Sequence, residues 1–372
     1  MAGIGPVLLA AGGTGGHLFP AEALAAVLAR QGVVVHLASD ERAAKFGAGF
    51  PAAAVHAIPA ATPSGRSPVG MAKAAIKLGQ GVLAAYGVIG RVRPSVVVGF
   101  GGYPTVPPVL AASLRGVPTL IHEQNGVLGR ANRLLASRAT AIATGFPQVR
   151  GIEGPLAAKQ VHTGNPVRPA VLEAAKTPFA EPAPGGTLDL LVFGGSQGAR
   201  VMSDIVPPAL ERLPAQARAR LRIVQQAREE DLARVRDTYA QLGVTAEIAA
   251  FFKDLPARMA AAHLVVGRSG ASTVAELAVI GRPSILVPLP QSLDGDQAAN
   301  AVSLEAIGAA TVIRQSDFTP DRLAAELAAR LADPGSLVRA AAAARGAGLP
   351  DAAERLAACV MRLAGKTQEI AA

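Results

Sequence analysis

The chain contains one cysteine, Cys359, no tryptophan, and aromatic residues at only 3% of its 372 positions. A single cysteine excludes an internal disulfide framework and fits a reducing compartment. Cys359 lies at helical spacing from Leu356 and Leu363, so we expect a small buried apolar residue rather than a reactive thiol. With so few aromatic residues, platforms on which nucleic-acid bases could stack are scarce.

Acidic residues are absent from a long part of the N-terminal half. None lies between Glu41 and Glu123, whereas eight Lys and Arg do. Residues 1–165 hold 14 basic and 5 acidic residues and residues 166–372 hold 22 of each, so the first part carries the whole net charge of +9. A one-sided cationic surface suits anionic lipid headgroups or nucleic acid. The scarcity of aromatic residues favours a membrane surface, and ordinary solvated charge is the alternative.

Long uninterrupted apolar runs are also missing. The longest uncharged stretch, residues 94–114, has the length of a membrane span but contains Pro104, Pro107, Pro108 and several glycines. We therefore expect no transmembrane helix. The first basic residue is Arg30, so we expect no secretory signal either.

Short β-branched runs alternate with alanine- and leucine-rich segments of helical periodicity, which predicts an α/β fold with doubly wound parallel sheets. The pattern restarts in the second half of the chain. We predict strands at residues 7–9, 33–37, 95–98, 118–122, 139–143, 188–193, 222–224, 263–267, 283–288 and 310–313.

The restart indicates two Rossmann-like units in tandem, because AGGTGGH (residues 11–17) is echoed by GGSQGAR (residues 194–200). We place an N-terminal domain at residues 1–165 and a C-terminal domain at residues 166–345. The alanine-rich tail has an apolar face that can pack on either domain.

A glycine turn after a parallel strand lets backbone amides approach an anion at the positive end of the next helix. Thr14, Gly15 and Gly16 hold that place in the first unit, and Ser196 holds it in the second. Neither loop has the G-x-G-x-x-G spacing of dinucleotide-binding folds, which argues against a nicotinamide-dependent oxidoreductase. GFGGYPTVPP (residues 99–108) is a third glycine cluster and reads either as a ligand loop or as packing turns.

RSGASTVAELAVIG (residues 268–281) follows another predicted strand. Ser269 or Ser272 is expected to cap a helix whose amino end attracts a diphosphate, with Glu276 one turn further on for a ribose. Asp294 and Asp296 have the spacing of a metal-binding pair, but no histidine or third carboxylate is close in sequence. We expect no metal and no cofactor.

Seven segments in order resemble the MurG family, glycosyltransferases of family 28 that transfer N-acetylglucosamine from UDP-N-acetylglucosamine to lipid I, forming lipid II in peptidoglycan synthesis. They are GGTGGH (12–17), GGY (101–103), HEQN (122–125), GNPVR (164–168), GGSQGAR (194–200), RSGASTVAE (268–276) and Gln297. The resemblance implies a GT-B fold with two Rossmann-like domains facing a cleft and a C-terminal helix, about residues 346–364, that packs on the first domain.

The resemblance also implies roles for individual residues. Ser196 and the amides of Ala271 to Val274 hold the donor's diphosphate, Glu276 its ribose, and the backbone at Phe252 the uracil. Arg168 and Gln297 contact the donor's phosphate and sugar, and lipid I lies on the glycine loops around Gly15 and Gly102. The substrate-binding set expected is Thr14, Gly15, Gly16, Asn125, Arg168, Ser196, Phe252, Ala271, Ser272, Thr273, Val274, Ala275, Glu276 and Gln297.

One segment departs from the family. The family usually shows His-Gln-(Ser/Thr)-Gly where this chain has Gln225-Gln226-Ala227-Arg228. We therefore carry over from the family no donor contact for this segment.

His17 is the predicted general base. Its imidazole can accept the proton of the C4 hydroxyl of the muramoyl residue, and a helix amino end disfavours the charged form. Attack opposite the leaving UDP inverts the anomeric centre. Glu123 is the second candidate, and the alternative is that His17 only orients phosphate.

Residues 69–93 carry Lys73, Lys77, Arg91 and Arg93 among aliphatic residues, which suits peripheral binding to anionic lipid on the cytoplasmic face of the inner membrane. Their glycines leave a buried helix-and-turn as an alternative. Two other functions are kept open: a GT-B transferase resembling diacylglycerol galactosyltransferases, and a non-enzymatic nucleic-acid binder. The expected partners are UDP-N-acetylglucosamine, lipid I and an anionic membrane, with no nucleic acid.

Overall fold

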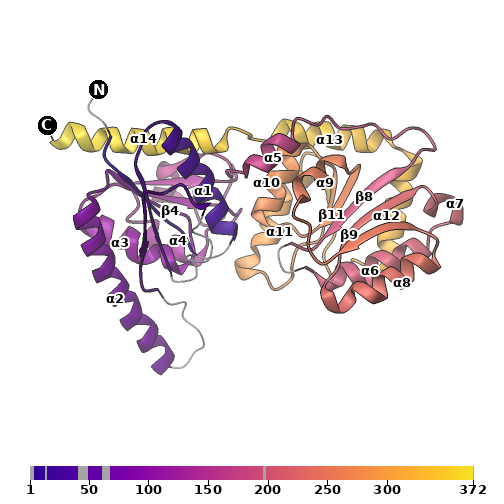
Figure 1. The fold of residues 1–372 in the computed structure, drawn as a ribbon, viewed down its shortest axis with the longest axis horizontal. Helices are drawn as coiled ribbons and strands as arrows, with labels where there is room; N and C mark the ends of the chain where they lie inside the picture. Colours follow the sequence, from indigo (N-terminus) through magenta and orange to yellow (C-terminus); the bar gives the residue numbers. More distant parts are fainter. Residues whose placement is uncertain (1–3, 13–14, 41–48, 61–67, 196–197, 372) are drawn as a thin grey trace. The chain divides into compact units, whose positions relative to one another are not determined.

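A computed structural model describes residues 4–12, 15–40, 49–60, 68–195 and 198–371 of the chain. They divide into two compact units (Figure 1). Unit 1 comprises Met1–Arg168 together with Pro350–Ala372, and unit 2 comprises Pro169–Leu349. Both boundaries fall a few residues later in the chain than the sequence pattern placed them.

Unit 1 is built on a parallel sheet with the strand order β3-β2-β1-β4-β5-β6-β7. Buried β-branched and leucine residues form its central strands, as expected where helices cover both faces. The strands are β1 (Val7–Ala10), β2 (Val35–Ser39), β3 (Ala54–Ala57), β4 (Val96–Gly99), β5 (Thr119–Glu123), β6 (Ala141–Thr144) and β7 (Gln160–His162).

Alanine- and leucine-rich segments between these strands form the helices of unit 1. The first helix ends before Gly32, which takes a left-handed conformation (φ 77°), and Val33 N donates to Leu28 O. The helices are α1 (Gly15–Arg30), α2 (Pro68–Val92), α3 (Val106–Leu114), α4 (Arg130–Leu135) and α14 (Ala352–Ala371), with short 3₁₀ turns η3 (Tyr103–Thr105) and η4 (Gly154–Lys159).

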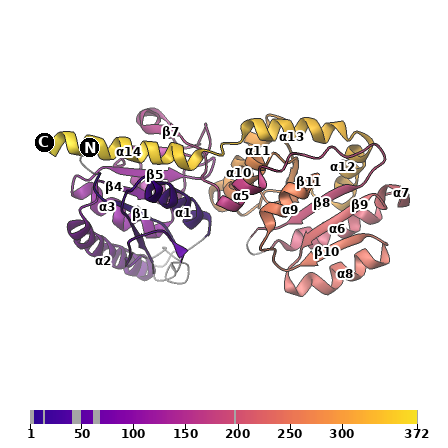
Figure 2. The same cartoon turned by 45° about the horizontal axis from the view of Figure 1, so that its top comes forward.

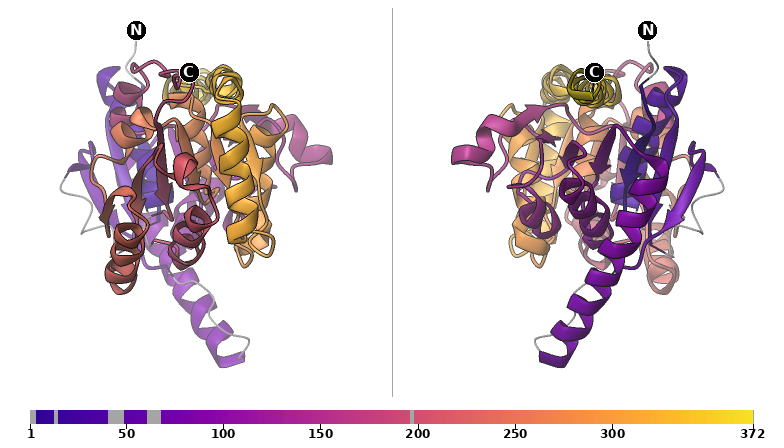
Figure 3. Two further views of the ribbon diagram at one scale, coloured as in Figure 1. Left: turned by 90° about the vertical axis from the view of Figure 1, so that its right-hand side faces the viewer. Right: turned by 90° about the vertical axis from the view of Figure 1, so that its left-hand side faces the viewer.

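A single regular helix, α2, spans the segment for which the sequence analysis kept a helix-and-turn as an alternative because of its glycines. Its C-terminal half packs on the domain, where Ala85, Val88 and Ile89 are buried. Its N-terminal half extends away from the rest of unit 1 (Figure 3). The glycines are tolerated because packing of the C-terminal half stabilises the whole helix.

The chain returns to unit 1 at its C-terminus. Helix α14 runs along unit 1 and packs against α1 (Figure 2). Leu356, Ala357 and Val360 are fully buried in the core cluster that also contains Leu24 and Leu28 of α1. Cys359 is buried in the same cluster, as the spacing predicted.

Unit 2 repeats the architecture, with the strand order β10-β9-β8-β11-β12-β13, all parallel. Both orders are those of doubly wound folds, so the predicted α/β class is confirmed. The strands are β8 (Leu188–Phe193), β9 (Leu221–Gln226), β10 (Thr245–Ala249), β11 (Leu264–Gly267), β12 (Ser284–Leu286) and β13 (Ala310–Val312). The helices are α5 (Pro169–Ala174), α6 (Arg200–Glu211), α7 (Ala215–Arg218), α8 (Leu232–Gln241), α9 (Leu255–Ala261), α10 (Ala271–Ile280), α11 (Asp296–Glu305), α12 (Pro320–Ala332) and α13 (Gly335–Ala347), with η5 (Glu229–Asp231) and η6 (Leu293–Gly295).

Three strands escaped the sequence analysis: β3, β7 and β10. Each lies at an edge of its sheet and is partly exposed, so its residues form no apolar run. The central strands, which are buried on both faces, were all predicted. Strand register then places the glycine loops together, since Ala10 of β1 pairs with Gly99 of β4 and Phe193 of β8 pairs with Gly267 of β11.

Packing of α14 on unit 1 gives the first prediction. Leu356→Ala should lower the free energy of unfolding of unit 1 by about 2–5 kcal/mol, because it leaves a cavity in a closed core. Denaturant unfolding followed by circular dichroism measures this loss. Arg362→Ala, an exposed position of the same helix, should change the free energy by less than about 0.5 kcal/mol. Equal effects of the two substitutions would contradict the packing of α14.

Candidate functional site

His17 lies in the first turn of α1, directly after the loop that leaves β1. Its ring packs on the loop after β4, where Gly101 and Gly102 both have positive φ, 85° and 74°. A Cβ on Gly101 would lie 3.3 Å from His17 Cε1, and one on Gly102 would lie 3.3 Å from His17 Nε2. Glycine tolerates the positive φ and leaves room for the ring at both positions, so the GGY segment forms the surface on which the imidazole packs.

Burial lowers the pKa of His17, and the Phe100 carbonyl and the Gln124 side chain oppose the shift by favouring the charged ring. Neither group makes a hydrogen bond of normal geometry with Nδ1, which is buried without a partner among the described residues. The ring is therefore neutral at pH 7. A neutral imidazole can accept a proton.

His122, the last but one residue of β5, is a buried second imidazole beside His17. Its Nε2 donates to Gly164 O at 3.1 Å, and its Nδ1 accepts from Gln124 Nε2 at 3.2 Å. Both nitrogens are thus occupied in the neutral form, and burial lowers the pKa of His122 to about 4. His122 is a fixed structural group, since protonating Nδ1 would oppose its amide donor.

Glu123 ends β5 and its carboxylate is saturated with hydrogen bonds. Oε1 accepts from Asn125 N at 3.0 Å and Asn125 Nδ2 at 3.2 Å. Oε2 accepts from Gly129 N at 2.9 Å and Asn132 Nδ2 at 2.8 Å. Burial raises the pKa of Glu123 and the four donors oppose that shift. A carboxylate held by four donors shapes the loop that follows β5 and has little capacity left for a substrate proton.

The other predicted residues of unit 1 lie around the same edge. Gly15 and Gly16 open α1, and a Cβ at Gly16 would meet nothing within 4 Å. The Arg168 guanidinium lies 5.1 Å from the centre of the Phe19 ring, beside the start of α1. Thr14 lies outside the described residues.

In unit 2 the segment after β11 forms the start of α10, as predicted, but the cap differs. Gly270 is the N-cap residue and no side chain caps the helix. The expectation that Ser269 or Ser272 caps it is wrong. Ser269 is buried and its hydroxyl donates to Gln297 O at 2.8 Å, while Asn300 Nδ2 donates to Ser269 O at 3.1 Å. The serine joins the start of α10 to α11.

The first turns of α10 contain Ala271, Ser272, Thr273, Val274 and Ala275, with uncapped amides at the amino end. That end has no side-chain competitor for an anion, which suits a phosphate. Glu276 is 6% exposed and lies one turn further along the helix.

Gln297 opens α11 next to this helix. Its Oε1 accepts from Leu289 N at 3.0 Å, so the loop after β12 and the start of α11 are tied together. Together with the Ser269 contact, this brings Gln297 to the amino end of α10.

Phe252 lies at the other side of the sheet, after β10, with β9 and β8 between it and α10. Phe252 is buried, and the Arg258 guanidinium lies 4.3 Å from the centre of its ring, so the side chain is held in place. Ser196 lies outside the described residues. The flanking Gly195 and Gly198 have φ of 89° and 68°.

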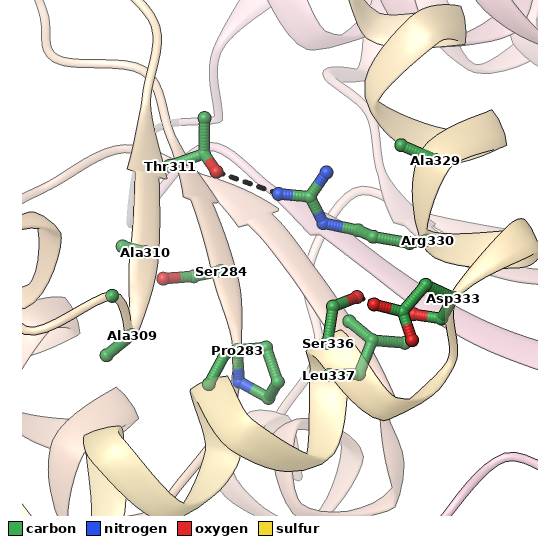
Figure 4. A pocket seen from close by; sticks show the side chains of 12 residues that line it. Pro283, Ser284, Ala309, Ala310, Thr311, Ala329, Arg330, Asp333, Ser336 and Leu337 are labelled. Carbon is green, nitrogen blue, oxygen red and sulfur yellow. Dashed lines mark hydrogen bonds between the residues drawn. The ribbon is translucent and has the colours of Figure 1, made fainter.

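A cavity of about 360 Å³ opens elsewhere in unit 2 (Figure 4). It lies at the amino ends of β12 and β13, where Ser284, Thr311 and Arg330 line it. Arg330 Nη2 donates to Thr311 Oγ1 at 2.8 Å. Parallel strands carry their ligand loops at their carboxyl ends. This cavity is therefore at the wrong end of the sheet for the predicted donor site, and no residue of that site lines it.

Within the described ranges, no three His, Cys, Asp or Glu side chains are grouped so that they could hold a metal ion. The same ranges contain no helix that is long and apolar enough to cross a membrane.

Sequence reasoning missed the polar residues that support the predicted ones. Gln124, Asn132 and Asn165 are buried amides that connect the loops of unit 1: Asn165 Nδ2 donates to Gln124 O at 2.8 Å, and Gln124 Nε2 donates to Phe100 O at 2.9 Å. The HEQN and GNPVR segments contained two of these amides. Their roles depend on loops that are distant in sequence.

Comparisons with known proteins agree on one family. Residues 7–144 match the glycosyltransferase family 28 N-terminal domain and residues 189–356 match the family's C-terminal domain. The chain is 64% identical over 359 residues to a "UDP-N-acetylglucosamine--N-acetylmuramyl-(pentapeptide) pyrophosphoryl-undecaprenol N-acetylglucosamine transferase" of Methylobacterium sp. strain 4-46, with 96% of each chain covered. A protein of the same name from Rhodopseudomonas palustris is 60% identical over 96% of this chain and 98% of its own.

Solved structures agree. MurG of Acinetobacter baumannii superposes with a TM-score of 0.79 at 29% identity, covering 96% of this chain and 99% of that one. A UDP-GlcNAc 2-epimerase from Neisseria meningitidis has a TM-score of 0.64 at 13% identity, over 96% of this chain and all of that one, and so shares the fold alone.

The close packing of His17 on Gly102 leads to the second prediction. Gly102→Ala should lower turnover by about 10²-fold, because the new Cβ displaces the imidazole. The matched control is Gly32→Ala, which has the same positive φ but no atom within 4 Å of its Cβ. Backbone strain should cost each variant about 1–3 kcal/mol of stability, since Gly102, with φ 74° and ψ 156°, lies in a region that residues other than glycine rarely adopt. Similar turnover of the two variants, measured under conditions where both are folded, would contradict the role of Gly102.

Proposed function

The chain belongs to glycosyltransferase family 28, and we propose that it carries out the reaction for which its relatives are named. It transfers N-acetylglucosamine from UDP-N-acetylglucosamine to the muramoyl residue of a pyrophosphoryl-undecaprenol-linked acceptor, lipid I, giving lipid II. Identity of 64% across nearly the whole chain is the observation that carries this conclusion. The donor-binding and glycine-loop segments lie within the matched regions.

The direct test incubates the protein with UDP-N-acetylglucosamine and a lipid I analogue and identifies the product by mass spectrometry. Formation of the disaccharide lipid supports the proposal. Turnover of UDP-galactose with diacylglycerol instead would favour the related lipid transferases.

The donor's place in unit 2 is the amino end of α10. The amides of Ala271 to Val274 hold the diphosphate, and their partial positive charge stabilises the leaving UDP without a metal. Glu276 accepts from the ribose hydroxyls, and the backbone at Phe252 binds the uracil edge. Gln297, Ser196, Arg168 and Asn125 complete the donor's contacts.

Unit 1 binds the acceptor. Its pyrophosphate lies on the glycine loops around Gly15 and Gly102, at the amino end of α1. His17 is seated between these loops and accepts the proton of the C4 hydroxyl as that oxygen attacks the anomeric carbon. Glu123, held by four donors, orders the loop that carries Asn125.

His17 supplies the third prediction. His17→Ala should lower kcat by about 10² or more while the donor's KM changes little. Since burial lowers the pKa of His17, the wild-type rate should fall only as the pH drops below the ordinary value near 6.5. This acidic limb should vanish in His17→Ala. An unimpaired kcat would remove the assignment as base.

Peripheral attachment to the membrane is proposed for the exposed side of α2 between residues 73 and 83. Ile76 and Leu83 are 62% and 76% exposed and lie seven residues apart, on one side of the helix, and Lys73 and Lys77 in the turns around Ile76 are exposed as well. Apolar side chains that enter the acyl boundary, flanked by lysines that meet anionic headgroups, form an interfacial surface. Such a surface matches an acceptor that is anchored by a polyprenyl chain.

The fourth prediction follows from this surface. Leu83→Glu should weaken binding to vesicles containing anionic lipid by about 10-fold, since burying one leucine contributes about 1.5–3 kcal/mol. Val302→Glu, which changes a similarly exposed residue of unit 2, should leave vesicle binding unchanged. Binding should also weaken as salt rises. Equal binding of the wild type to neutral vesicles would count against the proposal.

A further inference from the structure

The segment that departs from the family pattern, residues 225–228, lies next to a predicted phosphate loop. It ends β9, and β9 pairs along its length with β8, whose glycine loop follows at the same edge. No role in donor binding was predicted for these four residues. Two of their side chains contact the elements proposed to hold the donor.

Gln226 connects the loops on either side of it. Its Oε1 accepts from Gly194 N at 3.0 Å, and its Nε2 donates to Ala250 O at 3.1 Å. The side chain is 6% exposed, so these bonds are sheltered from water. One amide thus fixes the start of the glycine loop relative to the segment that leads to Phe252.

Arg228 lies across the same glycine loop. A Cβ at Gly198 would be 3.1 Å from Arg228 Cγ and 3.9 Å from its Nε. The Nε atom is buried and has no hydrogen-bond partner among the described residues. Among the described residues Arg228 has one ion pair, and it is long, 3.8 Å from Nη1 to Glu230 Oε1. The side chain is 40% exposed, so part of the guanidinium group's hydrogen-bonding capacity remains for a ligand.

The carboxylates of Asp204 and Asp231 pair with another arginine, Arg234. Asp231 is engaged by Arg234 at 2.7 Å, and Asp204 by the same Arg234 at 2.8 Å. Arg200, at the start of α6, is 3.5 Å from Asp204. The loop therefore combines the amino end of α6 with a weakly paired guanidinium.

An anion with several oxygens fits this combination. A guanidinium binds phosphate through two parallel N–H bonds, and the amino end of α6, which begins two residues after Gly198, favours the same anion. The uridine nucleotide donor presents such a diphosphate at the carboxyl edge of this sheet.

We propose that Arg228 binds the diphosphate of the uridine nucleotide donor and that Gln226 is a positioning residue that holds the glycine loop for it. This rests on the proposed function, which supplies the donor.

The test compares three inhibitors of the transferase, uridine, UMP and UDP, on Arg228→Gln. We expect about a 10-fold weaker inhibition by UDP and a similar rise in the KM of UDP-N-acetylglucosamine, with uridine changed less than about 2-fold, because only a phosphate loses a charged hydrogen bond. Arg228→Lys keeps the charge and should recover part of the loss. Direct calorimetric binding of UDP gives the same comparison without transfer, so it separates this inference from a failure of the proposed reaction.

Arg222→Gln is the matched control, because Arg222 lies on the same strand and is bound to Asp189 at 2.6 Å. It should bind UDP as the wild type does. Equal weakening of UDP and uridine by Arg228→Gln, or no weakening of either, would overturn the diphosphate contact. The Arg228 side chain is 40% exposed, so the variant is expected to fold, and thermal unfolding verifies this.

Gln226→Leu tests the positioning role. Since Gln226 joins the glycine loop to the uracil-binding segment, its loss should weaken uridine and UDP by a similar factor, about 10-fold, while the acceptor's KM stays unchanged. Unchanged inhibition by both nucleotides, or a change in the acceptor's KM alone, would overturn this role.

Discussion

The buried carboxylate of Glu123 is the constraint on which the loops around His17 depend. Four donors from the following loop and from α4 converge on its two oxygens. A buried charge is tolerable only when its hydrogen bonds are complete, so the loop has one conformation. That conformation fixes Gln124, and Gln124 in turn reaches Phe100 O and His122. The imidazole of His17 is seated next to this network, on the glycines that follow Phe100.

The two imidazoles of this network have opposite tasks although burial lowers the pKa of both. His122 uses both ring nitrogens for hydrogen bonds inside the domain, so it is neutral and inert. His17 is held by no such pair of bonds, since its buried Nδ1 has no hydrogen-bond partner among the described residues. The difference lies in hydrogen bonding rather than in desolvation. This supports His17 over His122 and Glu123 as the group that accepts the substrate's proton.

The sequence predicted the parts of the fold that burial dictates. Central strands such as β4 and β8 are continuous apolar runs because helices cover both faces, and each was found. The edge strands β3, β7 and β10 were missed because exposure relaxes their composition. At the candidate site, the glycine loops after β4 and β8 were predicted, since a positive φ favours glycine. Gln226 and Arg228 were missed because their contacts depend on Gly194 and Gly198, which a neighbouring strand supplies.

A departure from a family pattern does not imply a lost function. The pattern His-Gln-(Ser/Thr)-Gly and this chain's Gln-Gln-Ala-Arg share the second residue, Gln226, whose side chain joins the loops after β8 and β10. The last residue differs most in chemistry: Arg228 adds a cation beside a loop that glycine would leave open. Glycine at the last position of the pattern supplies no charge, so Arg228 adds one, while Gln226 joins the loops after β8 and β10 in this chain. A retained glutamine beside an added cation is the arrangement expected when a binding site is kept and its electrostatics are adjusted.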